Sequence, residues 1–580
     1  MAARGSSARF AAVASLVLTL AGALPGWAAV AADGDTAPQT FTLTDTRKAL
    51  AVPKPERPLP SARLGQALDS AFLPQVALPA VDRDALLARD EKDRRSGRLK
   101  ALRYGIGRPV RLGAADGSWY RVEGGYLWVA EVTSPEALGL RLHFAGVRLP
   151  AGAELAVYGV AGPAAAPKVE RRTGAPGSAQ AAGSFWTRTL PGDRARIEVF
   201  LPGESRQLPF TVDRLQHLYL DPVTEATSPG SVGNKWVKRV GPCHNDVTCY
   251  ADWRETANSV GGTGFIGGGD ALFCTGQLLN NDRADFTPYF LTAHHCQSTQ
   301  GEAASTEFYW FYQSATCGGA PPRLDEVPTS AGATLLATGA ASDYTLLMVE
   351  GALPSGLSWA GWTSAVVPDG VLAAGIHHPD GTYKRISFGQ KAPGAACGSS
   401  SLLRISWIDG PTEPGSSGSG IFRRDTHQLF GQLFFGPSSC SSVTYDCYGA
   451  FSATYPHISG FLSAGADEAR AQNKTCARAR TVGAGKLAGV ARATGDDWYR
   501  AEIPAGRTLR VTLDLVHADG DIDLRLLGAC GTAPLAVSDS ATDREEVTFR
   551  NTGAQTATYT WQVFLASDTR NAYTMRVAIE

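Results

Sequence analysis

A histidine, an aspartate and a serine stand at the ends of three strand-like stretches in the second half of the sequence. His295 closes the apolar run of YFLTAHHC (289–296), Asp343 opens SDYTLLMV (342–349), and Ser417 lies in TEPGSSGSG (412–420). A serine becomes a nucleophile when a base takes its proton, an acid orients the base, and backbone N–H groups stabilise the oxyanion. These three residue types together predict nucleophilic acyl transfer.

Each of the three stretches also has a plainer interpretation. GSSGSG is typical of a flexible linker, HHC fits a pair of histidines at a strand end, and an Asp before a strand fits a turn. The order His, Asp, Ser among cysteines favours the catalytic interpretation. Because adjacent strand residues point to opposite faces, only one of His294 and His295 can meet Ser417.

The N-terminus predicts export. Arg4 and Arg9 precede a short apolar run at 10–24, and Ala29-Val30-Ala31 fits a signal-peptidase site, so residues 1–31 are expected to be a signal peptide. An uncleaved anchor is the alternative. No later stretch is long and apolar enough to span a membrane. The mature protein is therefore expected to be secreted, with no membrane attachment.

Composition limits the classes of partner. Lys and Arg total 54 against 55 for Asp and Glu in 580 residues, so no charge excess favours nucleic acid or an anionic membrane. Ten cysteines, all at or beyond Cys243, predict disulfides in an exported chain. No CxxC pair occurs, and adjacent His377 and His378 do not suit one tetrahedral ion, so neither a metal nor a cofactor is expected.

Cysteine placement and turn composition divide the chain. We expect a signal peptide (1–31), a partly β, cysteine-free propeptide (32–238) cut near NKWVKR (234–239), a catalytic domain (239–465), a linker (466–479) and a small β-sandwich (480–580). In the last block, Asp519, Asp521 and Asp523 suit either a turn or a calcium ion, and the turn is favoured.

TAHHC, SDYTLL and GSSGSG resemble the motifs of chymotrypsin-fold serine endopeptidases. A denser resemblance is to bacterial lysyl endopeptidases of the Achromobacter and Lysobacter type, through CTGQLLNN (274–281), FYWFYQSATC (308–317), IHHPDGTYKRIS (376–387) and GQLFFGPSSC (431–440). The resemblance implies a mainly β fold with two six-stranded barrels. It also implies His295 as base, Asp343 as its orienting acid, Ser417 as nucleophile, and the Gly415 and Ser417 amides as the oxyanion hole.

The same resemblance extends to activation and specificity. Ser416 stands where chymotrypsin-like enzymes carry an Asp that pairs with a new N-terminus, so propeptide removal is expected to act by uncovering the cleft. Asp446 in YDCYG (445–449) is implied at the base of a pocket for a cationic side chain, with an ordinary surface Asp as the alternative. Where relatives can carry a histidine near the substrate-binding strand, this chain has Phe434 and Phe435. Cleavage after arginine as well as lysine is therefore an alternative to strict lysine preference.

The resemblance implies the pairs Cys243–Cys440, Cys249–Cys317 and Cys274–Cys296. The cysteines that remain suggest the pairs Cys397–Cys447 and Cys476–Cys530. The last block resembles bacterial pre-peptidase C-terminal domains through DDWYRAEIPAG (496–506) and GDIDLRLLG (520–528).

The sequence therefore predicts a secreted serine endopeptidase, made as a zymogen, that cleaves protein or peptide substrates after Lys, with Arg as a second residue to be tested. It is expected to act as a monomer. The alternatives are a binding protein or adhesin on a protease-like scaffold, and a protease of the same fold with another specificity.

Overall fold

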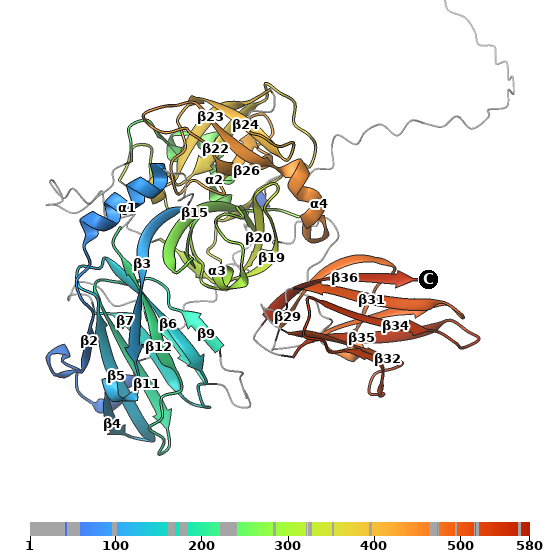
Figure 1. Ribbon diagram of the computed structural model, residues 1–580, viewed down its shortest axis with the longest axis horizontal. Coiled ribbons are helices and arrows are strands. Elements are labelled where there is room, and N and C mark those ends of the chain that lie inside the picture. Colours follow the sequence, from blue (N-terminus) through green and yellow to red (C-terminus); the bar gives the residue numbers. More distant parts are fainter. Residues whose placement is uncertain are drawn as a thin grey trace, which may run out of the picture. The chain divides into compact units, whose positions relative to one another are not determined.

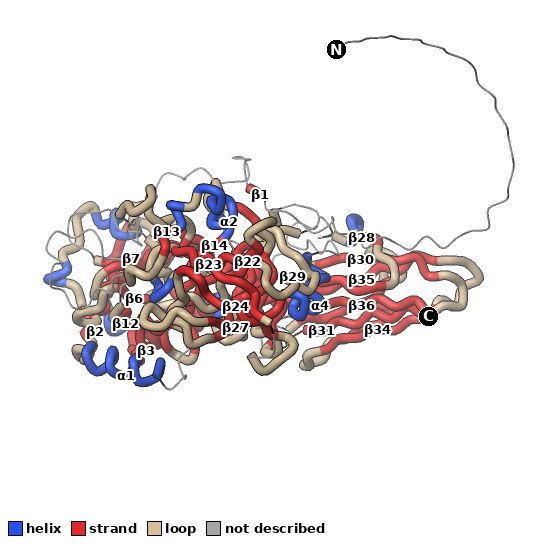
Figure 2. Tube along the Cα trace, turned by 90° about the horizontal axis from the view of Figure 1, so that it is seen from above, coloured by secondary structure: helices blue, strands red, loops and turns tan. Residues whose placement is uncertain are grey.

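The computed structural model describes residues 41–42, 58–95, 101–160, 169–174, 183–220, 240–281, 286–320, 322, 327–350, 353–393, 397–462, 473, 475–492, 496–515, 517, 521–566 and 570–580. The predicted signal peptide, the predicted cleavage segment at 234–239, Asp519 and most of the predicted linker lie outside these residues. Figure 2 shows that strands predominate over helices in the described chain and that the helices are short.

Two sheets form the N-terminal part, as labelled in Figure 1. One sheet has the order β2 (Gln75–Ala77), β5 (Gly125–Thr133), β11 (Arg194–Pro202), β7 (Glu154–Gly159), β8 (Glu170–Thr173), with β4 (Ser118–Val122) on β5. The other contains β10 (Leu190–Pro191), β6 (Gly139–Val147), β12 (Thr211–Leu218) and β3 (Leu102–Leu112), with β9 (Gly183–Trp186) on β6. Their apolar side chains share one buried cluster.

One helix precedes these sheets. The polar run that includes RDEKDRR lies in α1 (Arg83–Arg95). Its side chains are mainly charged, so packing against an apolar core does not explain its position. Arg103 of β3 instead forms ion pairs with Asp90 (2.8 Å) and Asp93 (2.7 Å) of the helix.

The first central sheet carries the candidate histidine and aspartate. Its strands follow the order β18 (Thr329–Ala331), β17 (Glu307–Tyr309), β14 (Val260–Gly267), β15 (Asp270–Leu278), β16 (Tyr289–Thr292), β20 (Tyr344–Val349), β19 (Ala333–Gly339). β14 and β15 form a hairpin through Gly268 and Gly269, which both have positive φ as tight turns require. β15 also pairs with β3, so one sheet continues from the N-terminal part into the central part.

The second central sheet closes on itself. Its ring has the order β23 (Arg385–Ala392), β22 (Leu372–His377), β25 (Gly420–Arg423), β26 (Leu429–Phe435), β27 (Tyr445–Ala450), β24 (Leu402–Asp409), with β24 pairing back to β23. β13 (Asn245–Asp246) adds to β23, and β1 (Phe41–Thr42) pairs with β21 (Ser358–Trp359). Three helices complete this part: α2 (Arg254–Ser259), α3 (Gln300–Ala304) and α4 (Phe451–Leu462).

Two further sheets form the C-terminal part. They are β28 (Arg480–Thr481), β30 (Asp497–Ile503), β35 (Ala557–Leu565), β32 (Ile522–Leu527), β33 (Pro534–Ser538), and β29 (Gly485–Arg492), β36 (Arg570–Ile579), β31 (Thr508–Leu515), β34 (Arg544–Arg550). Both contribute to one apolar cluster around Trp561 and Met575, as a sandwich requires. The mainly β prediction, with barrel-like sheets in the centre, is confirmed.

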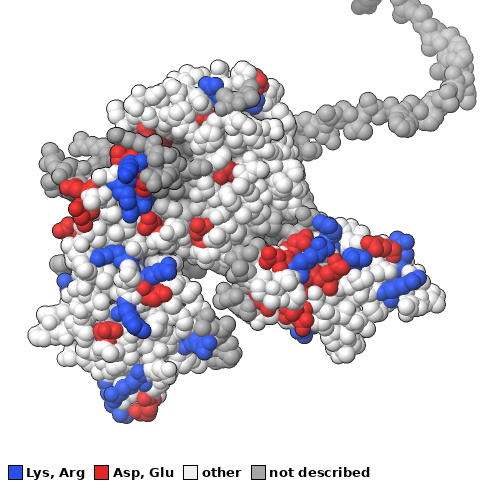
Figure 3. Space-filling view, in the orientation of Figure 1, with Lys and Arg blue, Asp and Glu red and all other residues white. Residues whose placement is uncertain are grey.

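Five disulfides cross-link the chain from Cys243 onward. They join Cys243–Cys440, Cys249–Cys317, Cys274–Cys296, Cys397–Cys447 and Cys476–Cys530, the same five combinations that were expected. Among the helices described, none has the length and apolar character needed to cross a membrane. Lys, Arg, Asp and Glu are interspersed on the face drawn in Figure 3, in keeping with the balanced composition.

Candidate active site

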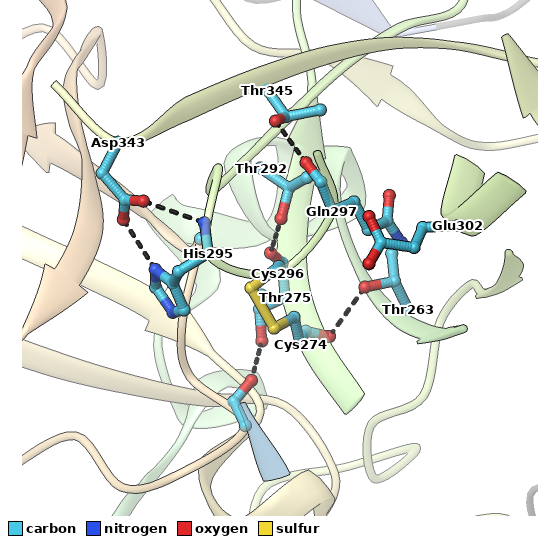
Figure 4. The surroundings of a disulfide bond; sticks show 12 residues. Thr263, Cys274, Thr275, Thr292, His295, Cys296, Gln297, Glu302, Asp343 and Thr345 are labelled. Atoms are coloured by element: carbon cyan, nitrogen blue, oxygen red, sulfur yellow. Dashed lines mark hydrogen bonds and ion pairs between the residues drawn. A yellow bond between two sulfur atoms is a disulfide. The ribbon is translucent and has the colours of Figure 1, made fainter. Parts of the chain in front are cut away.

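His295 and Asp343 are brought together by two paired strands. β16 ends at Thr292, which pairs with Thr345 of β20, so the residues just after β16 lie beside those just before β20. Oδ2 of Asp343 accepts a hydrogen bond from His295 Nδ1 at 2.7 Å, and Oδ1 accepts one from the His295 backbone N–H at 2.9 Å (Figure 4). Asp343 has φ 53°, and this left-handed backbone accompanies the inward turn of its carboxylate.

This arrangement fixes the imidazole as a base. With Nδ1 donating to the carboxylate, the remaining lone pair is on Nε2. Nε2 is buried and has no hydrogen-bond partner among the described residues. The neighbouring His294 turns elsewhere, since its Nδ1 is 2.8 Å from the hydroxyl oxygen of Thr338. Of the two histidines, His295 is therefore the one that meets the aspartate.

The Ser417 turn lies against the same strand ends. The backbone N–H of Thr275 in β15 donates to the Ser417 carbonyl at 2.9 Å, and the Thr275 hydroxyl donates to the Gly415 carbonyl at 2.8 Å. At Gly418, a Cβ would lie 2.3 Å from Oγ1 of Thr292 and 2.9 Å from the backbone N of Ala293. The serine turn is thus packed against the segment that leads into His295.

A disulfide braces this junction. Cys274, which precedes Thr275 in β15, is bonded to Cys296, which follows His295 (Figure 4). Oγ1 of Thr292 also donates to the Thr275 carbonyl at 2.8 Å. The strand that holds the serine turn and the segment that carries the imidazole are therefore joined covalently and by a side-chain hydrogen bond.

Ser416 has a partner that the sequence argument did not identify. His377, at the end of β22, has Nδ1 2.8 Å from Oγ of Ser416 and Nε2 2.9 Å from Oγ of Ser387. All three side chains are buried, and the Glu413 backbone N–H donates to Oγ of Ser416 at 3.2 Å. Burial lowers the pKa of His377 well below its ordinary value, so a neutral imidazole links two serine hydroxyls. Gly415, which precedes Ser416, has φ 91°.

Asp446 is buried beneath the start of the serine loop. Its Oδ2 accepts hydrogen bonds from Trp407 Nε1 and the Thr412 hydroxyl, both at 2.6 Å, and its Oδ1 accepts one from the Ser438 backbone N–H at 3.2 Å. Burial raises the pKa of Asp446 to about 6, although the hydrogen bonds from Thr412 and Trp407 act in the opposite direction. The alternative of an ordinary surface Asp is excluded because only 1% of the residue is exposed.

Two phenylalanines lie beside the imidazole. The Phe434 ring centroid is 5.7 Å from that of His295, and the Phe435 ring stands perpendicular to the Phe434 ring at 4.8 Å. Phe435 is 43% exposed, a large apolar surface for a folded protein. An aromatic ring therefore forms part of the surroundings of the His295 imidazole.

Potential metal ligands meet in one place within the described residues: Cys243, His244 and Cys440. The two cysteines form a disulfide, so neither offers a thiolate. His378 is buried, stacks on Tyr312 with ring centroids 5.7 Å apart, and has Nδ1 2.9 Å from the Thr382 carbonyl oxygen. These contacts give His378 a packing role.

Comparison with known proteins gives the family. The C-terminal domain of lysyl endopeptidases matches residues 237–449, and the lysyl endopeptidase N-terminal domain matches residues 77–219. The lysyl endopeptidase of Pseudomonas aeruginosa is 29% identical over 298 residues, which are 48% of this chain and 63% of that protein. The chain thus spans less than two thirds of the length of this relative.

Solved structures give weaker matches. A thermostable serine protease from an extremophilic microorganism is 15% identical, with TM-score 0.26, over 35% of this chain and 96% of that chain. Human heparin binding protein is 14% identical, with TM-score 0.28, over 36% and 93%. An inactivated protease paralogue of the scabies mite is 14% identical, with TM-score 0.29, over 36% and 96%.

The two barrel-like central sheets, with a His–Asp pair beside a serine turn, place the chain in the chymotrypsin-like class. Both lysyl endopeptidase domains occur in it, one after the other, and together they match more than half of its residues. The chain belongs to the lysyl endopeptidase family.

Proposed function

We propose that the chain is a secreted serine endopeptidase that cleaves peptide bonds on the carboxyl side of lysine and is made as an inactive precursor. The observation that carries this proposal is the His295–Asp343 pair with its buried, unpartnered Nε2 beside the Ser417 turn. In the proposed reaction, Nε2 takes the hydroxyl proton as Oγ of Ser417 attacks the carbonyl carbon. The proton then passes to the leaving amine, and water hydrolyses the acyl-enzyme with the same base.

Backbone amides complete the proposed machinery. The N–H groups of Gly415 and Ser417 are the candidates for the oxyanion hole, and Gly415 has the positive φ that lets such a turn form without strain. Ser416, held by His377, fixes the peptide between them. Asp343 stabilises the imidazolium that forms transiently and keeps the ring oriented.

Lysine preference is supported by Asp446. A buried carboxylate, three of whose acceptor positions are used, retains capacity for one more donor, and an ammonium group would supply both the donor and the opposite charge. Arginine, with its planar fork of donors, would have to displace existing partners of the carboxylate to bind through two bonds. We therefore infer that lysine is cleaved faster than arginine.

Secretion and latency are part of the proposal. The disulfides suit an oxidising compartment, and the family match at 77–219 covers a separate N-terminal domain that precedes the catalytic one. The predicted signal peptide and the basic segment at 234–239 supply an export signal and a cleavage site.

The first test replaces the nucleophile. Ser417→Ala should lower kcat for a lysyl p-nitroanilide by about four to six orders of magnitude, while circular dichroism and the melting temperature stay close to the unaltered chain. A fluorophosphonate should label processed protein at Ser417 and fail to label the variant. Unchanged turnover in the variant would reject the assignment, and an unlabelled, inactive processed protein would favour the binding-protein alternative.

A further inference from the structure

The edge of β15 that faces away from β14 carries three partners in succession. β14 pairs with residues 270–277 along one edge. On the other edge, β3 pairs with residues 271–273, the Thr275 N–H donates to the Ser417 carbonyl, and β16 pairs with residues 277–278. The nucleophile's turn is therefore seated between a strand of the N-terminal domain and the strand that leads to the catalytic histidine.

β3 stops where the serine turn begins. Leu102 pairs with Phe273, and Thr275, two residues or about 7 Å further along β15, already bonds the Ser417 carbonyl. Ala101, 3% exposed, packs against Cys274 and Cys296, the disulfide that flanks His295. The first described residues of β3 thus lie immediately beside the catalytic junction.

β3 runs in the direction expected of the part of an extended substrate that follows the scissile bond. β3 runs antiparallel to β15, so its N-terminal end is nearest Ser417 and the chain then leads away. An extended substrate bound in the same direction would place the residues that follow its scissile bond along this edge. Proteins commonly bind extended peptides as an added strand in this way.

The side chains of β3 occupy a prepared apolar surface. Leu102 and Tyr104 pack in a buried cluster with Phe273, Tyr309 and Tyr312 of the central part. At Gly107, a Cβ would lie 2.1 Å from the Gly269 carbonyl oxygen, so the two backbones are in direct contact at the β14–β15 turn. This contact tolerates no side chain.

Polar contacts from β3 and from its neighbours β12 and β6 join the N-terminal part to the central part. Arg103 donates to Asp270 of β15 at 3.1 Å, and Nε2 of Gln216 in β12 donates to the Gly269 carbonyl at 2.9 Å. Nη2 of Arg141, which is 2% exposed, donates to the Ser305 carbonyl at 2.5 Å. A buried guanidinium that bonds a carbonyl of the partner domain indicates an interface built for lasting contact.

We propose that β3 is an autoinhibitory strand: it occupies the edge of β15 beside Ser417 on which the leaving-group side of a polypeptide substrate binds, and its departure frees that edge. This inference rests on the proposed function and adds the mechanism of its latency. It predicts that the intact precursor cleaves a substrate more slowly when the substrate continues beyond the scissile bond than when it ends there.

The test uses the full chain with Lys235, Lys238 and Arg239 changed to Gln, so that the predicted cleavage segment stays intact. Gly107→Val places a side chain against the Gly269 carbonyl and should loosen β3. Gly113→Val is the matched control, because its Cβ would meet only Oδ2 of Asp116, at 3.9 Å. Each chain is assayed with a lysyl p-nitroanilide and with a peptide that continues for four residues after lysine.

In Gly107→Val, the peptide rate should rise at least tenfold relative to the anilide rate, and Gly113→Val should behave like its parent. An equal gain on both substrates, or no gain on the peptide, would overturn the proposal. If the processed, unaltered protein cleaves neither substrate, it is the proposed function that fails.

A second measurement does not depend on the folding of Gly107→Val. Hydrogen exchange in 270–274 is followed in the Ser417→Ala chain after added wild-type enzyme has cut it and the N-terminal domain has been removed. A peptide extending past lysine should slow exchange there, whereas a peptide ending at lysine should not. Equal protection by both peptides, or by neither, would contradict the proposed use of this edge.

Discussion

His377 links the residue before Ser417 to the second central sheet. Its two ring nitrogens contact Oγ of Ser416 and Oγ of Ser387, and Ser387 in turn donates to the Pro411 carbonyl at 2.9 Å. The chain of hydrogen bonds thus ties both ends of the segment before the nucleophile to β22 and β23.

We expect His377→Phe to damage catalysis more than binding. The variant leaves two buried hydroxyls without their imidazole partner, which costs about 1–3 kcal/mol for each group left unsatisfied, and loosens the turn that carries the oxyanion amides. kcat for a lysyl amide should fall at least tenfold, with a smaller change in KM. His377→Asn, which can bond one hydroxyl, should recover part of kcat; equal loss of kcat in both variants alongside an unchanged melting temperature would contradict a positioning role.

If Asp446 binds the substrate lysine as proposed, we expect the substrate preference to depend on pH. Its pKa of about 6 means that the carboxyl is neutral below that pH and charged above it. The ratio of kcat/KM for a lysyl substrate to that for an isosteric norleucyl substrate should therefore be constant above pH 7. Below pH 6 it should fall up to about tenfold per pH unit. The ratio cancels any pH dependence that both substrates share.

The matched variant for this prediction is Asp446→Asn. It keeps the size and shape of the side chain but removes the charge, so the lysyl preference should fall by about 2–4 kcal/mol, or roughly one and a half to three orders of magnitude. The remaining ratio should not vary between pH 5 and 8. A ratio with the same pH profile in the variant would assign the titration to another group.

At the residue scale, His295, Asp343, Ser417 and Asp446 could be nominated as candidate site residues because the residues around them resemble a family pattern. The Ser416–His377 contact could not, since it joins residues 39 positions apart whose only local signal is a buried histidine at a strand end. Thr275 lies in the family-like stretch CTGQLLNN, yet its hydrogen bonds to the serine loop form only when the loop packs against β15, which no local pattern indicates.

At the scale of elements, Gly418 is where the serine loop meets the first central sheet. Its φ is 82°, and an added Cβ would lie 2.3 Å from Oγ1 of Thr292 and 2.4 Å from the Thr275 carbonyl oxygen. Both obstacles belong to β15 and β16, which are fixed by the Cys274–Cys296 disulfide. The loop can approach His295 only because this position has no side chain.

Gly418→Ala should therefore lose activity and stability together. We expect a destabilisation of about 2–4 kcal/mol, from roughly 1–2 kcal/mol of left-handed backbone strain plus the displacement of packed strands, and a fall in kcat of at least 100-fold. Gly398→Ala is the control, because Gly398 has a similar φ of 78° with nothing within 4 Å of its Cβ. If both variants lose the same free energy of unfolding, backbone strain alone explains the effect.

Elements with strong alternation were predictable, and edge elements were not. Trp498–Ile503, Thr508–Leu513 and Tyr559–Leu565 fall within β30, β31 and β35. β33 escaped prediction because its residues are mostly exposed and it pairs only with β32, so no buried face marks it. The pairing of β3 with β15 was also beyond the sequence, because strand partners separated by more than 150 residues leave no local pattern.

At the scale of the whole molecule, the apolar residues form separate clusters. The N-terminal sheets bury one cluster around Trp128 and Phe144, and the C-terminal sheets bury another around Trp561, with no residue shared between them. The central sheets have their own clusters. Because the C-terminal cluster shares no residue with the others, it predicts a separate cooperative unfolding unit with its own disulfide.

The Cys476–Cys530 disulfide tests this division. It lies wholly in the C-terminal part and closes a loop of 54 residues, so the chain-entropy model predicts a contribution of about 4 kcal/mol to that unit alone. Replacing both cysteines with serine should lower one calorimetric transition by several degrees, leave the others in place, and leave kcat/KM for a lysyl amide unchanged. The proposed catalytic residues lie outside the C-terminal cluster. A loss of activity together with a lowering of every calorimetric transition would therefore mean that the cores unfold as one unit, and would contradict the division.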